Sequence, residues 1–179
     1  MNDYKTYKID IEVKELTDYI KLSNNKFHHI FGRNNSTDYY YMYNFFSIAS
    51  CNQHVYKLYT ELLRCIRDYT TTHDQLWLQS WINLHTKDQV LQSHSHDFPI
   101  HGYISITDHK TTTVFTDSHN GNIMYEIQNQ PGQIYIGPGF RYHHVRVDED
   151  FDDERITLGF DLQTSNMISE NFSFIPIVL

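Results

Sequence analysis

The stretch Leu76-Trp77-Leu78-Gln79-Ser80-Trp81-Ile82-Asn83-Leu84 decides the fold class, because its side chains alternate in character along the chain. Alternation with a period of two is typical of a β-strand, in which successive side chains point to opposite faces. One face of this strand would carry Trp77, Gln79, Trp81 and Asn83. The stretch therefore predicts a strand at the point where the chain changes from a helical to a strand-like pattern.

Downstream of this strand, short apolar runs alternate with turn-forming residues. We expect further strands near 91–107, 111–117, 122–128, 133–137, 143–147, 155–162 and 172–178. Turn signals separate several of them: Asn120-Gly121-Asn122, Gln130-Pro131-Gly132, Gly137-Pro138-Gly139 and the acidic segment 148–153. Many short strands with regular turns are typical of a β-sandwich or barrel. The acidic residues at 148–154 are expected to form a solvated loop.

Upstream, the chain is predicted to be mainly helical. We expect a strand at 7–13, a short helix at 14–22, a polar loop at 23–38 and a helix at 39–49. A clearer helix follows, because apolar residues recur at helical spacing from Val55 to Ile66. Ser50-Cys51-Asn52-Gln53, directly ahead of them, has the form of a capping box.

This order of elements predicts how the chain is organised. Helices first and strands later indicate helices packed on one outer face of a barrel. We predict a single domain over residues 1–179, in which 1–74 supply a strand and supporting helices and 75–179 supply a mainly β core.

Composition narrows the class of protein. The formal net charge of −8 argues against a nucleic-acid partner, which would call for a basic surface. Cys51 and Cys65 show no CxxC pattern and are expected to be reduced thiols in a cytoplasmic protein. No signal peptide is recognisable, and no apolar run reaches the ~18 residues of a membrane span. Four of the histidines lie in polar segments and are expected to be solvated: His28, His29, His73 and His119.

Two histidine-rich stretches, 92–97 and 142–145, predict a metal site. On a strand, His94 and His96 would lie on the same face, one pleat apart, where two imidazoles can bind one ion. Alternation in the second stretch gives one face to His143 and the other to His144, and we choose His143 as the third ligand. Ligands drawn from two strands leave an open coordination position, as catalytic metals require.

The stretch Arg155-Ile156-Thr157-Leu158-Gly159-Phe160 also alternates. Its three apolar side chains share a face that suits packing against helices. The other face, with Arg155, Thr157 and Gly159, is poor core material but suits a cavity for a small anion, since a guanidinium binds a carboxylate through two hydrogen bonds. Sequence alone supports equally a surface arginine paired with one of the acids at 152–154.

Taken in order, these motifs resemble the small iron(II)- and 2-oxoglutarate-dependent oxygenases often encoded by bacteriophages. The motifs are Trp81-Ile82-Asn83, His94-Ser95-His96, Gly132 to Pro138 with the following His143, and Arg155-Ile156-Thr157. The resemblance covers residues 75–162, and the N-terminal part carries no motif of the family. It implies a double-stranded β-helix, a jelly-roll or cupin-like barrel, with the N-terminal helices packed on one outer face.

The resemblance also implies roles for residues. His94 or His96, with His143, would bind iron(II). Arg155 would bind the far carboxylate of 2-oxoglutarate with the help of Thr157. Asn83 and Tyr103 would lie along the cavity.

One position departs from the family pattern, which is His-x-Asp/Glu followed by a distant His. The residue two places after His94 is His96 and not an acid. The ligands are therefore either His94, His96 and His143, or one of the first two with His143 and Asp97.

The implied function is that of a 2-oxoglutarate-dependent dioxygenase, which hydroxylates a peptide, prolyl residues included, or a small molecule and releases succinate and CO2. One alternative is a cupin-type metalloprotein: a 2-oxoglutarate-independent dioxygenase, an isomerase or a binding module. Another is a metal-free jelly-roll protein of phage assembly. The oligomeric state is open, because the apolar segment 172–179 could close the sheet as a terminal strand or pair with a second subunit in a homodimer.

Overall fold

The computed structural model describes residues 3–32, 36–72, 74–89, 92–117, 120–164 and 170–177. Helical elements follow a first short strand, β1 (Lys5–Lys8): α1 (Val13–Phe31), the 3₁₀ segments η1 (Ser36–Met42) and η2 (Phe45–Cys51), and α2 (Gln53–Thr70). The remaining elements are strands: β2 (Leu76–His85), β3 (Ile100–Ser105), β4 (Thr111–Thr116), β5 (Ile123–Gln128), β6 (Gln133–Pro138), β7 (Tyr142–Val147), β8 (Arg155–Gln163) and β9 (Ile175–Ile177).

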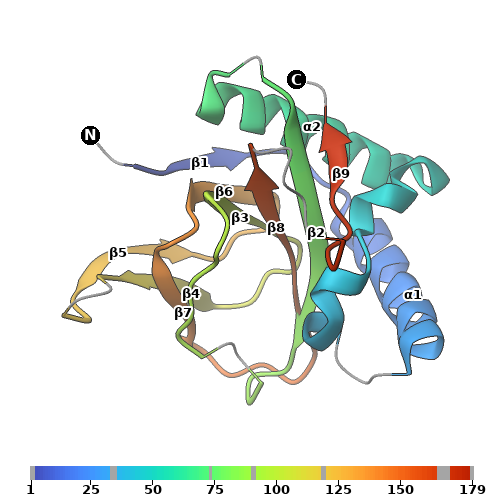
Figure 1. Ribbon diagram of the computed structural model, residues 1–179. Coiled ribbons are helices and arrows are strands. Elements are labelled where there is room, and N and C mark those ends of the chain that lie inside the picture. Colours follow the sequence, from blue (N-terminus) through green and yellow to red (C-terminus); the bar gives the residue numbers. More distant parts are fainter. Residues whose placement is uncertain are drawn as a thin grey trace.

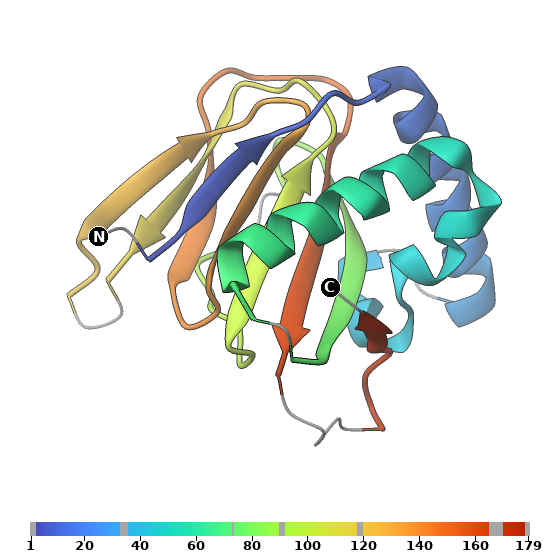
Figure 2. The same ribbon diagram turned by 90° about the horizontal axis from the view of Figure 1, so that it is seen from above.

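The strands form two antiparallel sheets. The larger has the order β1-β6-β3-β8-β2-β9, and the smaller has the order β5-β4-β7. Figure 1 shows the small sheet on one side of the large sheet and the helices on the other, and the view from above separates the same three layers (Figure 2). This is the mainly β, jelly-roll architecture of a double-stranded β-helix with helices on one outer face, as predicted.

The helices are held by the apolar face of the large sheet. Ile156, Leu158 and Phe160 of β8 are fully buried in one cluster with residues of both helices, such as Leu16 and Leu62. Burying a side chain of this size contributes about 1.5–3 kcal/mol. The predicted packing of this face of β8 is thus confirmed, and its opposite face is left free to line the space between the two sheets.

The N-terminal half differs most from the prediction. The loop expected at 23–38 is largely helix, because α1 continues to Phe31 and ends at Gly32, whose φ of 64° is left-handed. The buried Asn24 and the partly buried Phe27 and Phe31 continue the inward stripe of Leu16 and Ile20, so the polar composition hid an amphipathic helix.

Other boundaries also shift. The first strand ends at Lys8, and the single helix expected at 39–49 is two short 3₁₀ segments. Helix α2 begins at Gln53 with Asn52 as its N-cap, so the capping box placed the start two residues too early. The Asn52 carboxamide accepts hydrogen bonds from the backbone N–H of His54 and Val55, at 2.8 and 3.2 Å.

One strand prediction is wrong in a way that matters for the site. The strand expected at 91–107 begins only at Ile100, and the described residues before it form a loop in which His94 makes a single bridge to His143. The terminal strand β9 pairs with β2 at the edge of the large sheet. His73 and His119 lie outside the described residues. Within the described chain, neither helix is long and apolar enough to cross a membrane.

Candidate metal centre

A cavity of about 240 Å³ lies between the two sheets. The inner faces of β2, β3 and β8 form one wall. Thr113 of β4 and His143 and Val145 of β7 contribute from the small sheet, and the loop 94–98 lies at the mouth. The cavity is therefore bounded by the predicted metal stretch on one side and the predicted anion-binding strand on another.

The structure brings His94, His96 and His143 together. One ligand atom from each imidazole lies within 4.8 Å of the others. Alternation along a strand does not produce this arrangement. Instead, His94 exchanges two backbone hydrogen bonds with His143, of 3.0 and 2.9 Å, and the backbone N–H of His96 donates to the Gly139 carbonyl at 2.8 Å. These bonds fix the loop against the turn before β7 and the strand itself.

Each of the three imidazoles has an acceptor beside its Nδ1 atom. The Nδ1 of His94 lies 2.7 Å from the Gln92 carbonyl, and that of His143 lies 3.1 Å from the Arg141 carbonyl. The Nδ1 of His96 lies 3.1 Å from the Asp161 carboxylate. Since carbonyl and carboxylate oxygens only accept, Nδ1 is placed to donate its proton, and Nε2 is the ring atom left for a metal ion.

This pattern fits a metal ion. Metal-binding histidines generally donate their other ring N–H to a carbonyl or a carboxylate, which fixes the tautomer. The Nε2 of His96 is buried and has no hydrogen-bond partner among the described residues. A buried polar atom without a partner is costly in free energy, so this lone pair suits an ion that the protein would bind there.

The electrostatics favour neutral imidazoles at His94 and His143. Burial lowers the pKa of His94, and burial followed by the neighbouring imidazoles holds the pKa of His143 well below its usual range. Neutral imidazole is the form that binds metals.

Two residues near the trio were missed by sequence reasoning: His101 on β3 and Asp161 on β8. They face each other across the paired strands, with 2.9 Å between the His101 Nδ1 and an Asp161 oxygen. With His96 they form a second group of possible ligands. Extending the alternation of 155–160 by one residue would have placed Asp161 on the cavity face, but no sequence signal gives the pairing of β3 with β8.

The structure places His143, His144 and Asp97, the residues on which the sequence left alternatives open, in different surroundings. His143 is buried in the cavity wall, whereas His144 is half-buried in the next position of β7 and does not line the cavity. Asp97 is exposed at the mouth and belongs to neither group of possible ligands.

Arg155 starts β8 and points into the cavity with an exposed fraction of 3%. Its Nε donates to the Thr111 hydroxyl at 3.0 Å, and within the described chain no acid lies at ion-pair distance from it. Burial lowers its pKa to about 10. A buried guanidinium without an acid is costly unless an anion arrives to pair with it.

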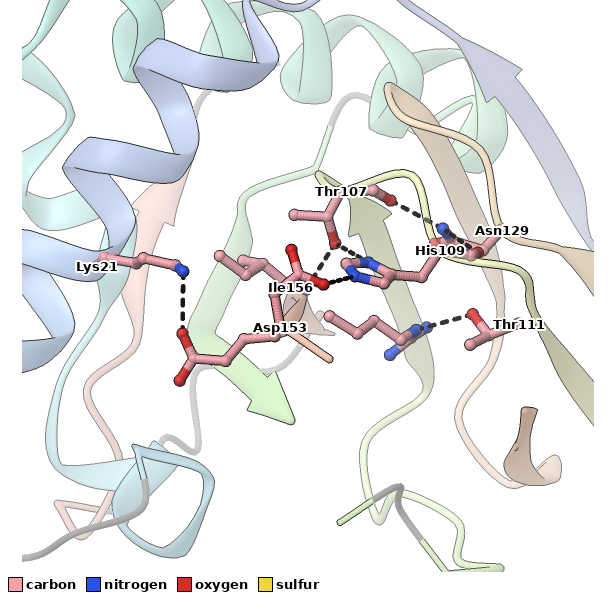
Figure 3. A network of polar contacts seen from close by, with 9 residues as sticks. Lys21, Thr107, His109, Thr111, Asn129, Asp153 and Ile156 are labelled. Carbon is pink, nitrogen blue, oxygen red and sulfur yellow. Dashed lines mark hydrogen bonds and ion pairs between the residues drawn. The ribbon is translucent and has the colours of Figure 1, made fainter. Parts of the chain in front are cut away.

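Arg155 is buried, so the surface pairing that the sequence allowed does not occur, and two of the acids that precede it are engaged elsewhere. Asp153 contacts the His109 Nε2 at 2.6 Å, and Glu154 contacts the ammonium group of Lys21 at 3.0 Å (Figure 3). The acidic segment is a mostly exposed loop, as predicted, and two of its acids make contacts with neighbouring elements. It ties the start of β8 to α1 and to the loop between β3 and β4.

The remaining predicted cavity residues, Asn83, Tyr103 and Thr157, are all buried in its wall. The Asn83 amide lies 3.4 Å from the Thr157 hydroxyl, and the Asn83 carbonyl oxygen accepts a hydrogen bond from the Trp81 indole at 3.1 Å. A Cβ atom at position 159 would lie 2.5 Å from the Trp81 ring, so the packing of that ring against β8 requires glycine at this position.

Comparison with known proteins supports the fold. No family model matches the sequence, and neither does the sequence of any curated protein. A prolyl-4-hydroxylase from Pseudomonas putida superposes with a TM-score of 0.58 over 92% of this chain and 94% of its own, at 10% identity. An oxidoreductase of the 2OG-Fe(II) oxygenase family from Burkholderia pseudomallei gives 0.49 over 63% of this chain, at 17% identity. This chain covers 59% of that second protein. At 10% identity, the similarity to the prolyl-4-hydroxylase shows a shared jelly-roll fold.

Proposed function

We propose that this protein is an iron(II)- and 2-oxoglutarate-dependent oxygenase, which hydroxylates a peptide, prolyl residues included, or a small molecule and releases succinate and CO2. One observation carries the proposal. A single cavity holds three imidazoles, each with an acceptor beside its Nδ1 atom, and a buried arginine that has no acid at ion-pair distance among the described residues. A metal ion would be the missing partner of the imidazoles, and a carboxylate of the co-substrate would be the missing partner of the arginine.

The metal would be held by His94, His96 and His143 through their Nε2 atoms. Three protein ligands leave coordination positions for the co-substrate and for oxygen. Bound iron(II) supplies oxygen activation and C–H oxidation, chemistry that side chains cannot perform alone. The protein orients the ligands through the Nδ1 contacts and surrounds them with a partly apolar cavity.

Arg155 would bind the far carboxylate of 2-oxoglutarate. Thr111 occupies Nε, and in the described part of the chain neither Nη atom has a hydrogen-bond partner, so the edge that grips a carboxylate is available. Burial raises the pKa of the Tyr103 phenol to about 12, which keeps it protonated as a donor. The Thr157 hydroxyl, oriented by Asn83, offers a further contact to the same carboxylate.

The test is turnover of 2-oxoglutarate to succinate with iron(II) and ascorbate. Wild type should turn over, and Arg155→Ala and His143→Ala should each lose activity. Arg146→Ala is the matched control, because Arg146 is an exposed arginine paired with Glu126 and Asp148 on the small sheet. Absence of both turnover and 2-oxoglutarate binding in wild type would contradict the proposal.

A cupin-type metalloprotein is the second candidate, since three imidazoles without a directly coordinating acid are the feature that favours it. The two functions separate at Arg155, which a cupin does not require. Metal binding without 2-oxoglutarate binding would favour the cupin.

A further inference from the structure

Asp161 is the only acid among the buried residues that the structure describes. It lies on the cavity face of β8, the same face as Arg155, Thr157 and Gly159. Its side chain is 1% exposed. A carboxylate taken out of water to this degree needs strong partners, because an unpaired buried charge is strongly destabilising.

Both partners of Asp161 are imidazoles of the candidate site. One oxygen lies 2.9 Å from the His101 Nδ1 and 3.1 Å from the His96 Nδ1. The other oxygen lies 3.2 Å from the His96 Nδ1. The two rings stack with their centroids 3.6 Å apart and their planes 15° apart. One carboxylate therefore fixes two parallel imidazoles from the same side.

This geometry separates two roles that an acid can have beside a metal. Since Asp161 occupies the Nδ1 edge of His96, only Nε2 remains for an ion, and the carboxylate lies on the far edge of the ring from it. Asp161 can therefore orient the ligand and make it more basic without touching the ion. The exposed Asp97 makes no comparable contact with a ring of the trio.

We propose that Asp161, and not Asp97, supplies the negative charge of the metal centre, by accepting hydrogen bonds from the Nδ1 atoms of His96 and His101. The family pattern has an acid two places after the first histidine, and here that position is His96. Asp161 would supply the charge instead from a different strand, β8, through the imidazole of His96. His101 braces the ring of His96 by stacking on it. This inference rests on the metal centre proposed above and assigns Asp161 as a positioning residue.

The first experiment compares Asp161→Asn with Asp97→Asn in anaerobic titrations with iron(II) and with cobalt(II), whose absorption reports ligand geometry. Asp161→Asn keeps the shape and removes the charge, and it should weaken metal binding by about 10–100-fold. Asp97→Asn should bind as wild type does. A loss confined to Asp97→Asn would overturn the inference. If wild type itself binds neither metal, the proposed function fails and this inference with it; if wild type binds and Asp161→Asn binds equally well, only the inference fails.

A second measurement does not depend on any variant being folded. Nitrogen-15 NMR of the histidine rings in metal-free wild type should show His96 and His101 with a proton at Nδ1 that is hydrogen-bonded. Finding His96 protonated at Nε2 instead would overturn the inference, whatever the titrations give. In Asp161→Asn the same spectra should show weaker Nδ1–H hydrogen bonds, a change that a purely structural role of Asp161 elsewhere in the fold would not produce.

Discussion

Arg155 and Asp161 lie at opposite ends of the same strand face, and their surroundings are opposite as well. Both are buried charges, with exposed fractions of 3% and 0%. Among the residues that the structure describes, the guanidinium has a hydroxyl as a partner and no acid, whereas the carboxylate has two imidazoles. Asp161 lies six positions after Arg155, a rise of about 20 Å along the strand, which is too far for the two charges to pair. One end of β8 is thus incomplete without a ligand, and the other is complete within the protein.

This difference in pairing indicates a separate role for each end of β8. A buried charge that the protein itself pairs holds its partners in a fixed geometry. A buried charge that is left unpaired lowers the stability of the ligand-free protein and favours binding of a ligand with the opposite charge. If this is right, substitutions at the two ends should have opposite effects on folding and on ligand binding. The following predictions test that contrast, from the largest expected effect to the smallest.

The largest effect should come from Arg155→Met. Removing one partner of a buried charge pair costs about 2–5 kcal/mol, so the dissociation constant of 2-oxoglutarate should rise by about 30-fold to several thousand-fold. The free energy of unfolding of the ligand-free protein should stay the same or increase, because an unpaired buried charge is removed. Calorimetric titration and urea unfolding measure the two quantities.

Arg155→Lys is the matched variant for this measurement. It keeps the charge but loses the planar fork, and it should bind 2-oxoglutarate more weakly than wild type and more tightly than Arg155→Met. Unchanged affinity in Arg155→Met would show that the unpaired cation is not a ligand site.

Asp161→Ala should do the reverse to stability. It leaves the Nδ1–H groups of His96 and His101 without an acceptor, at about 1–3 kcal/mol each. Urea unfolding of the metal-free protein should therefore show a loss of a few kcal/mol. Asp97→Ala removes an exposed acid and should change the same quantity by less than about 0.5 kcal/mol. Equal losses in the two variants would remove the contrast between a satisfied and an exposed acid.

The Arg155 end should also respond to pH through His85, its neighbour opposite on β2. Burial, followed by the charge of Arg155, lowers the pKa of His85 to about 4. The unfolded chain takes up this proton near pH 6.5, so between about pH 6.5 and 4 the unfolded state binds more protons. Stability due to this group is therefore complete above pH 6.5 and lost as the pH falls, by at most about 3 kcal/mol.

His85→Gln should flatten the fall in unfolding free energy across this window, and urea unfolding at several pH values measures it. His29→Gln, at an exposed position of α1, is the control and should leave the slope as it is. An unchanged slope in His85→Gln would show that His85 does not titrate with the lowered pKa.

The two ends also differ in how far the sequence could predict them. Alternation is a local property, so it placed Arg155 and Thr157 in the cavity and Leu158 against the helices correctly. The partnership of Asp161 with His101 depends on β3 lying beside β8, which is a matter of topology. His94, His96 and His143 lie together as expected, but for a different reason: backbone bonds to β7 and its preceding turn, and not a strand, align the loop that carries His94 and His96.

The smallest effect is expected where the start of β8 is tied to α1. Lys21 and Glu154 form an ion pair whose side chains are 41% and 38% exposed, and such pairs contribute roughly 0–1 kcal/mol and less at high salt. Glu154→Gln should therefore lower the free energy of unfolding by less than about 1 kcal/mol and leave 2-oxoglutarate binding unchanged.

The neighbouring contact of Asp153 with the buried His109 continues through the Thr107 hydroxyl to the backbone of Ile156 (Figure 3). Asp153→Asn should thus weaken 2-oxoglutarate binding more than Glu154→Gln does, because it loosens the backbone that positions Arg155. If Glu154→Gln had the larger effect on binding, the exposed pair would be positioning Arg155 and the assignment of the two contacts would be reversed.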